Sequence, residues 1–190
     1  MNAYLIQCIE KIAHTEHRNF QFEQGNLYKN KKTGFYILWI NRLKKQIKWQ
    51  EGYYKHGKRI GLWTKWYVNG NKDEEGNYVD GNKTGFWTEW RYYFGNKNGE
   101  GNYENGNKTG NWVFFHDNGT KWQEGHYKHG KQTGFWTGWY DTGNKEEEGY
   151  YDDCYYPGKR TGLWTYWYEN GIMMKGHYDQ GKRNGPWIYY

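Results

Sequence analysis

Residues 61–84 read Gly-Leu-Trp-Thr-Lys-Trp-Tyr-Val-Asn-Gly-Asn-Lys-Asp-Glu-Glu-Gly-Asn-Tyr-Val-Asp-Gly-Asn-Lys-Thr, and the same pattern begins again at Gly85. The glycine before the first tryptophan recurs at intervals of 24, 25, 24, 28 and 23 residues, at Gly61, Gly85, Gly110, Gly134, Gly162 and Gly185. A fixed period of this length is typical of a repeat array, in which each copy contacts mainly its neighbours. The sequence therefore predicts tandem structural units and not one ordinary globular core.

Each copy carries two turn signals, such as Asn69-Gly70 and Asp80-Gly81. These dipeptides supply the positive φ angles that tight hairpins require. We therefore expect an all-β fold over residues 20–190, an elongated, twisted, single-layer antiparallel meander of β-hairpins. Strand content should reach about 60%, well above that of ordinary proteins.

The turns also predict how the strands pair. If Asn69-Gly70 is a two-residue loop, Tyr67 lies opposite Lys72 and Trp63 lies opposite Gly76. The next turn then brings Gly85 beside Gly76. Glycine in a strand costs roughly 0.5–1 kcal/mol, which an indole ring covering the bare backbone more than offsets. We expect each ring to lie over the glycine pair of its own copy, in a first aromatic row of Trp63, Trp87, Trp112, Trp136 and Trp164 over glycines that include Gly76, Gly85, Gly101, Gly110, Gly125 and Gly134.

A second aromatic row is expected on the opposite face of the sheet. Side chains alternate along a strand, so Leu62, Thr64 and Trp66 point away from Trp63. A single layer cannot cover both faces, and an exposed apolar stripe marks an interface. The predicted partner-binding row consists of Trp66, Trp90, Phe115, Trp139 and Trp167, flanked by Leu62, Phe86, Phe135 and Leu163. The alternative is that threonines and long polar side chains cover these rings.

Positive charge is concentrated at one end of the chain. Residues 1–60 hold 12 Lys+Arg and 4 Asp+Glu, whereas residues 61–190 hold 15 and 17. Residues 1–19 form an expected helical leader, because Leu5, Ile6, Ile9, Ile12 and Ala13 recur at helical spacing. We expect Arg42, Lys44, Lys45 and Lys48, together with the stripe of Leu5, Ile9 and Ile12, to anchor the array to an acidic or apolar partner surface. An ordinary solvated basic surface would look the same. The near-neutral array disfavours nucleic acid as a partner.

No residue pattern indicates catalysis. His126 and His129 recur with the repeat and lack the cysteine or carboxylate spacing of a metal site. Acidic runs such as residues 146–148 fall at the same strand position in each copy, where cross-strand pairing with lysine explains them. We expect a non-enzyme that needs no cofactor and no metal. Only two cysteines and no apolar segment of about 20 residues favour an intracellular protein, cytoplasmic or cytoskeleton-associated.

The stretch from Gly61 to Gly70, followed by Glu75-Gly-Asn-Tyr-Val-Asp-Gly81, resembles the variant form of the MORN repeat. The resemblance covers residues 23–190 in about six to seven tandem copies. It implies a scaffold or adaptor that holds other proteins in a cytoskeletal, ciliary or membrane-associated assembly. The alternatives left open are a repeat array that binds a glycan or an anionic lipid, an antitoxin-like protein, and self-association into a homodimer.

Overall fold

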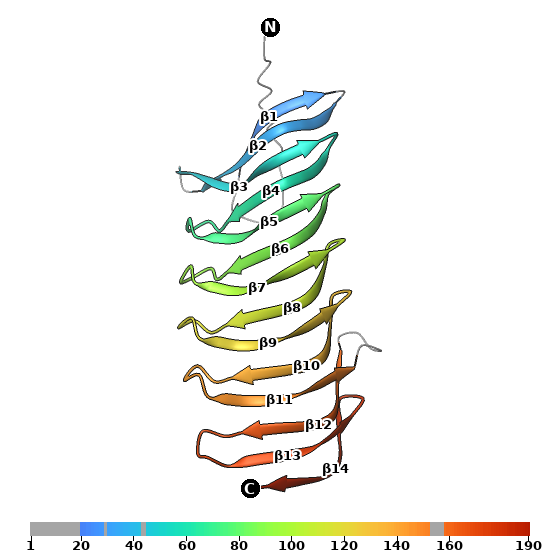
Figure 1. The fold of residues 1–190 in the computed structure, drawn as a ribbon. Helices are drawn as coiled ribbons and strands as arrows, with labels where there is room; N and C mark the ends of the chain where they lie inside the picture. The colour runs from blue at the N-terminus through green and yellow to red at the C-terminus, as the bar shows by residue number, and fades with distance from the viewer. Residues whose placement is uncertain (1–19, 29, 43–44, 153–157) are drawn as a thin grey trace. The chain divides into compact units, whose positions relative to one another are not determined.

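The computed structural model describes residues 20–28, 30–42, 45–152 and 158–190. The predicted all-β antiparallel meander is confirmed: within these residues, 14 strands follow one another, in two compact units that meet in sequence at Gly95 and Asn96 (Figure 1). Within each unit, every strand pairs antiparallel with the next one in sequence. The expected N-terminal helix and Lys44 lie outside the described residues.

The first unit contains six strands, β1 Phe20–Tyr28, β2 Lys31–Arg42, β3 Lys45–Lys55, β4 Lys58–Trp66, β5 Lys72–Val79 and β6 Asn82–Trp90. The second contains eight, β7 Lys97–Glu104, β8 Asn107–Phe115, β9 Lys121–Lys128, β10 Lys131–Trp139, β11 Lys145–Asp152, β12 Lys159–Trp167, β13 Met173–Asp179 and β14 Lys182–Tyr189.

Tight turns of two residues join β3 to β4, β5 to β6, β7 to β8, β9 to β10 and β13 to β14. Asp80 and Gly81 have φ angles of 50° and 88°, and they leave Val79 directly opposite Asn82. Two consecutive positive φ angles define the type I′ hairpin turn, whose twist matches that of the strands. The two-residue turn predicted at Asp80-Gly81 is therefore confirmed.

The connection at Asn69-Gly70 is wider than predicted. The Gly70 N–H donates to the Tyr67 carbonyl at 3.0 Å, the Tyr67 N–H donates to the Asn71 carbonyl at 2.8 Å, and Gly70 alone has a positive φ, 92°. This is a three-residue loop in which a β-turn is followed by a left-handed glycine. Lys72 therefore pairs with Trp66 and not with Tyr67, and that prediction was wrong. A bulge at Asp73 restores the predicted pairing of Trp63 with Gly76.

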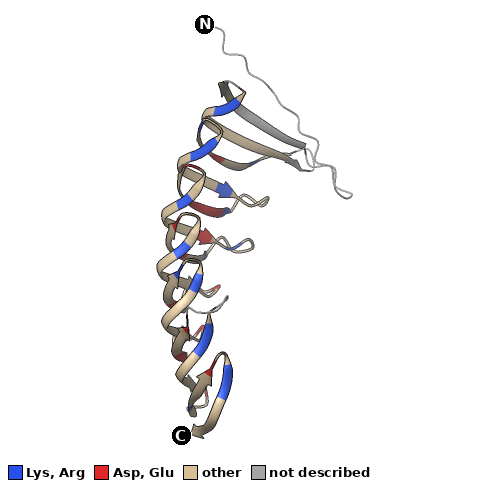
Figure 2. Ribbon diagram, turned by 90° about the vertical axis from the view of Figure 1, so that its right-hand side faces the viewer, with Lys and Arg blue, Asp and Glu red and all other residues tan. Residues whose placement is uncertain are grey.

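Each even-numbered strand bends at the glycine two residues before the ring that covers the preceding strand, which is Tyr36 in β2 and a tryptophan in the others. Trp63 pairs with Gly52 of β3, but the next pair is Ile60 with Tyr53, so Gly61 and Leu62 are left out of that ladder. Gly61 has a φ of 64°, which a side chain would disfavour. Such a bulge bends the strand, and the same curl recurs along each unit (Figure 2).

The bend allows a single layer to bury a row of rings. The five tryptophans of the first row are at most 3% exposed. Each ring covers one glycine of the preceding strand: a Cβ added at Gly76, for example, would overlap the ring of Trp87. We call the face that carries these rings the covered face. There the Trp87 Nε1–H also donates to the Asn77 carbonyl at 3.2 Å, and the ring of Tyr78 meets the ring of Trp87 edge-on, with the two centroids 5.2 Å apart.

The predicted glycine pairs do not form. Gly76, Gly101 and Gly125 lie under rings, but these rings belong to the following copy, Trp87, Trp112 and Trp136. The other predicted members, Gly85, Gly110 and Gly134, have φ angles of 65° to 67° and nothing within 4 Å of an added Cβ. Their role is to form the bend. The prediction failed because it assumed an unbroken ladder through the second glycine.

Candidate functional site

The second aromatic row lies on the face opposite the first row, as the alternation predicts; we call this face the open face. Its members Trp66, Trp90, Phe115, Trp139 and Trp167 are all half-buried. Lysine ammonium groups lie over rings of this row, with Lys48 at 4.7 Å from the centroid of Trp66 and Lys72 at 5.2 Å from that of Trp90. The same arrangement repeats at Trp139 and Trp167.

Each of these lysines is also held by a glutamate three residues later. The Lys72 Nζ lies 2.7 Å from the Glu75 Oε2, and the Thr64 hydroxyl donates to the same oxygen at 2.9 Å. Equivalent pairs, at 2.7–2.8 Å, join Lys48 to Glu51, Lys97 to Glu100, Lys121 to Glu124 and Lys145 to Glu148. Exposed ion pairs add little stability. They do neutralise the charge over the second row, because Lys48, Lys72, Lys121 and Lys145 are each matched by a carboxylate.

Exposed apolar side chains of the open face flank the second row. Leu62, Phe86, Phe135 and Leu163, predicted as flanking residues, are all exposed, and Phe86 is 56% accessible. They follow the bend glycine, so the bulge removes them from one ladder and turns them toward solvent. The flanking positions, and not the second row itself, carry the accessible apolar surface.

Sequence reasoning missed two members of this surface, Tyr53 and Tyr150. Tyr53 packs on Phe35 with ring centroids 5.1 Å apart, and Tyr150 packs on Phe135 at the same distance, yet both tyrosines stay more than half exposed. Both follow the glycine that a ring covers, a position where other copies have Asn77 and Asn102. An aromatic residue where other copies have asparagine is the signal that could have identified them.

The predicted basic anchor is only partly described. Lys48 belongs to the open face and is paired with Glu51, so it is not a spare cation. Arg42 ends β2 and Lys45 begins β3, and the two are paired in the ladder. The structure therefore places Arg42, Lys45 and Lys48 on two adjoining strands.

The covered face carries a row of cations over the buried rings. The Arg59 guanidinium lies 4.5 Å from the centroid of Trp63, and Arg160 lies 4.3 Å from that of Trp164. The Arg160 Nη2 also contacts both carboxylate oxygens of Glu147, at 3.0 and 2.8 Å. Burial raises the pKa of Glu147 although the charge of Arg160 opposes this shift.

Hydrogen bonds connect the three-residue loop of one copy to the backbone of a second-row residue in the next copy. The Tyr67 hydroxyl donates to the Trp90 carbonyl at 3.0 Å, and the Tyr140 hydroxyl donates to the Trp167 carbonyl at 2.8 Å. Burial, together with the Asp73 carboxylate, raises the pKa of Tyr67 to about 12. The neutral phenol is therefore part of the loop-to-loop contact.

Replacing Tyr67 by Phe should reduce the loss of stability at high pH. An unfolded tyrosine ionises near pH 10 and Tyr67 in the folded chain near 12. Its contribution is therefore complete below pH 10 and is lost as the pH rises toward 12. Urea unfolding between these pH values should show a shallower decline for Tyr67→Phe than for the parent. Tyr93→Phe, at an 82% exposed position, is the matched control; equal slopes for all three proteins would contradict the assignment.

Among the residues that the structure describes, no group of three or more His, Cys, Asp or Glu side chains is arranged to hold a metal ion. The described part of the chain also has no helix of the length and apolarity that crossing a membrane requires.

The chain was also compared with known proteins. Neither the models of protein families nor the sequences of curated proteins gave a match.

Proposed function

We propose that the chain is a non-catalytic scaffold that binds other proteins along its open face. The observation that carries the proposal is the combination of exposed apolar side chains with neutralised lysines. Phe86 in the first unit and Phe135 in the second are exposed beside half-buried rings whose lysines are paired with glutamates. Exposed aromatic surface with little net charge suits a protein partner.

The same observation weighs against phosphate-bearing partners. A nucleic acid or an anionic membrane binds through lysine and arginine side chains that exchange counterions for phosphate. On the open face such a partner would have to displace Glu75 from Lys72 and separate the equivalent pairs at Lys48, Lys97, Lys121 and Lys145. The resemblance to MORN repeats agrees with a protein scaffold, and a cytoskeletal, ciliary or membrane-associated assembly remains the proposed setting.

The proposal predicts that partner capture depends on the exposed rings. Immobilised chain would be incubated with extract of its native cells, and the captured proteins would be quantified for the parent and for Phe86→Ser/Phe135→Ser. We expect capture to fall at least about tenfold, because removing aromatic anchors from an interface typically costs more than 1 kcal/mol each. The fold should remain, since both side chains are exposed.

Asn111→Ser is the matched control. Asn111 occupies the position of Phe86 and Phe135 in its own copy and is exposed, so its substitution should leave capture unchanged. Raising the salt from about 0.1 to 0.5 M should also have little effect, because apolar contacts are not screened. Capture that survives the double substitution, or that collapses with salt, would refute an apolar protein interface on this face.

A further inference from the structure

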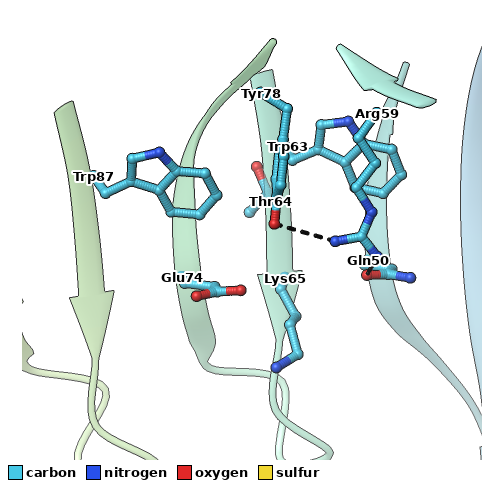
Figure 3. A pocket seen from close by; sticks show the side chains of 8 residues that line it. All are labelled: Gln50, Arg59, Trp63, Thr64, Lys65, Glu74, Tyr78 and Trp87. Carbon is cyan, nitrogen blue, oxygen red and sulfur yellow. Dashed lines mark hydrogen bonds between the residues drawn. The ribbon is translucent and has the colours of Figure 1, made fainter. Parts of the chain in front are cut away.

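The two faces of the first unit differ in how far their side chains satisfy one another. On the covered face, Arg59 donates to the amide oxygen of Gln50 at 3.0 Å and to the Tyr78 hydroxyl at 3.2 Å, among rings that are buried (Figure 3). On the open face, by contrast, exposed apolar side chains gather around Tyr53. The open face of this unit therefore has apolar surface that the described residues leave accessible.

Tyr53 of β3 is the centre of this apolar surface. It pairs with Phe35 of β2 and with Ile60 of β4, and side chains that lie opposite each other share a face. Ile37 follows Phe35 by two residues, and Leu62 follows Ile60 by two, so both adjoin the same group. The two rings and Leu62 are at least 43% exposed, and the two isoleucines are half-buried. We call these five residues the Tyr53 patch.

The second unit contains the same arrangement with two polar replacements. There Tyr150 pairs with Phe135 on one side and with Thr161 on the other. Leu163 has the place of the patch leucine, and Thr137 has that of the first patch isoleucine. The two isoleucines of the Tyr53 patch are thus threonines around Tyr150. The Tyr53 patch is the more apolar of two otherwise equivalent surfaces.

The isoleucines replace side chains that suit contact with water. The Thr64 hydroxyl donates to Glu75 at 2.9 Å, whereas Ile37 presents only methyl and methylene groups to Glu51, its partner in the ladder. Isoleucine at a solvent-facing position loses the free energy that burial of its apolar surface would provide. At the position of Ile60 the other copies have only polar residues, namely Thr33, Thr84, Thr109, Thr133, Thr161 and Asn184. The pattern indicates that something covers the Tyr53 patch and not the equivalent surfaces.

The residues before β1 lie outside the described residues, and they are attached next to the patch. β1 begins at Phe20, which lies opposite Asn41 of β2, about 13 Å along that strand from Ile37. Residues 17–19 span about 10 Å when extended, and a helix over residues 3–16 adds about 21 Å. The Tyr53 patch covers three strands, or about 10 Å across them. The helix that the sequence predicts is therefore close enough to reach the patch and long enough to cover it.

We propose that this helix folds back on the chain's own sheet and covers the Tyr53 patch with its apolar stripe. The stripe consists of Leu5, Ile6, Ile9, Ile12 and Ala13. The helix caps the open face at this end of the array, so the stripe is not available to an outside partner, and Phe86 and the second unit stay accessible. The inference does not rest on the proposed function, because it concerns a contact within one chain and its test needs no partner.

The test is disulfide formation between one cysteine in the stripe and one in the patch of the full chain. In a Cys8→Ser/Cys154→Ser background, Ile9→Cys/Leu62→Cys is compared with Ile9→Cys/Leu163→Cys, because Leu163 has the equivalent position in the second unit. Both leucines are exposed, so the fold should remain. We expect the first pair to oxidise within one chain at least about ten times faster, since a disulfide requires Cβ atoms about 3.8 Å apart.

Three further variants connect the rate to the stripe and the patch. The stripe cysteine is also placed at Leu5 and at Ile12, so that different positions of the helix along the patch are sampled. Ile37→Thr/Ile60→Thr gives the patch the residues of its equivalent around Tyr150, and it should slow the reaction at least about tenfold, as the loss of two apolar contacts implies. Lys11→Ser is the matched control, because Lys11 lies on the other side of the predicted helix from Ile9 and its substitution should leave the rate unchanged.

Mass spectrometry of a mixture of ¹⁴N- and ¹⁵N-labelled protein separates disulfides within a chain from those between chains. Faster oxidation with Leu62 than with Leu163 at one of the three stripe positions, within single chains, supports the contact. Equal rates at all three positions would overturn it, as would an unchanged rate in Ile37→Thr/Ile60→Thr. Disulfides that form between chains would also overturn it and would assign the Tyr53 patch to a second copy.

Discussion

Replacing Trp112 by Ala is expected to lower the free energy of unfolding by about 3–5 kcal/mol. The side chain is fully buried, and its ring covers Gly101. Its Nε1–H donates to the Asn102 carbonyl at 2.9 Å, and the ammonium of Lys108 lies 3.7 Å from the ring centroid. The substitution removes the largest ring of its copy, leaves a cavity in a single layer, and leaves that carbonyl without its donor.

Urea unfolding followed by far-ultraviolet circular dichroism would measure the effect. Trp122→Ala is the matched control, because Trp122 is 40% exposed and should cost much less. A similar midpoint for the parent and Trp112→Ala would show that the first row is not the core of the repeat.

The second large effect is expected at the glycines, where the two classes should respond differently. A methyl group at Gly76 would overlap the ring of Trp87, so Gly76→Ala must displace a residue that is 1% exposed. We expect a cost of about 1–3 kcal/mol, as for other overpacked cores. Gly85→Asn should cost less, because nothing lies within 4 Å of an added Cβ and Asn tolerates its φ of 65°.

The same urea experiment separates the two roles. A larger loss for Gly85→Asn than for Gly76→Ala would contradict the division into glycines covered by rings and glycines that bend the strand. A comparison of Gly101→Ala with Gly110→Asn repeats the test one copy further along the chain, where Trp112 is the covering ring.

The face on which the second aromatic row lies could be predicted from the sequence, whereas the exposure of its rings could not. Alternation placed Trp66 and Trp90 opposite the first row, because side-chain direction in a strand depends only on position parity. Their exposure was not predictable in the same way. It depends on Lys48 and Lys72, which reach these rings from the preceding strand and are held there by Glu51 and Glu75.

The sequence by itself determined the repeat and the antiparallel meander, since these follow from local turn residues and a period of two. The predicted pairing of Trp63 with Gly76 is present only because the bulge at Asp73 offsets the wider loop. Tertiary structure alone decided which glycine each ring covers, because the bulge at Gly61 shifts the ladder only when β3 and β4 are paired. It also decided that Arg59 faces an amide while Arg160 faces a carboxylate. Such contacts join residues on different strands, so they depend on register and bend, which no single stretch of sequence contains.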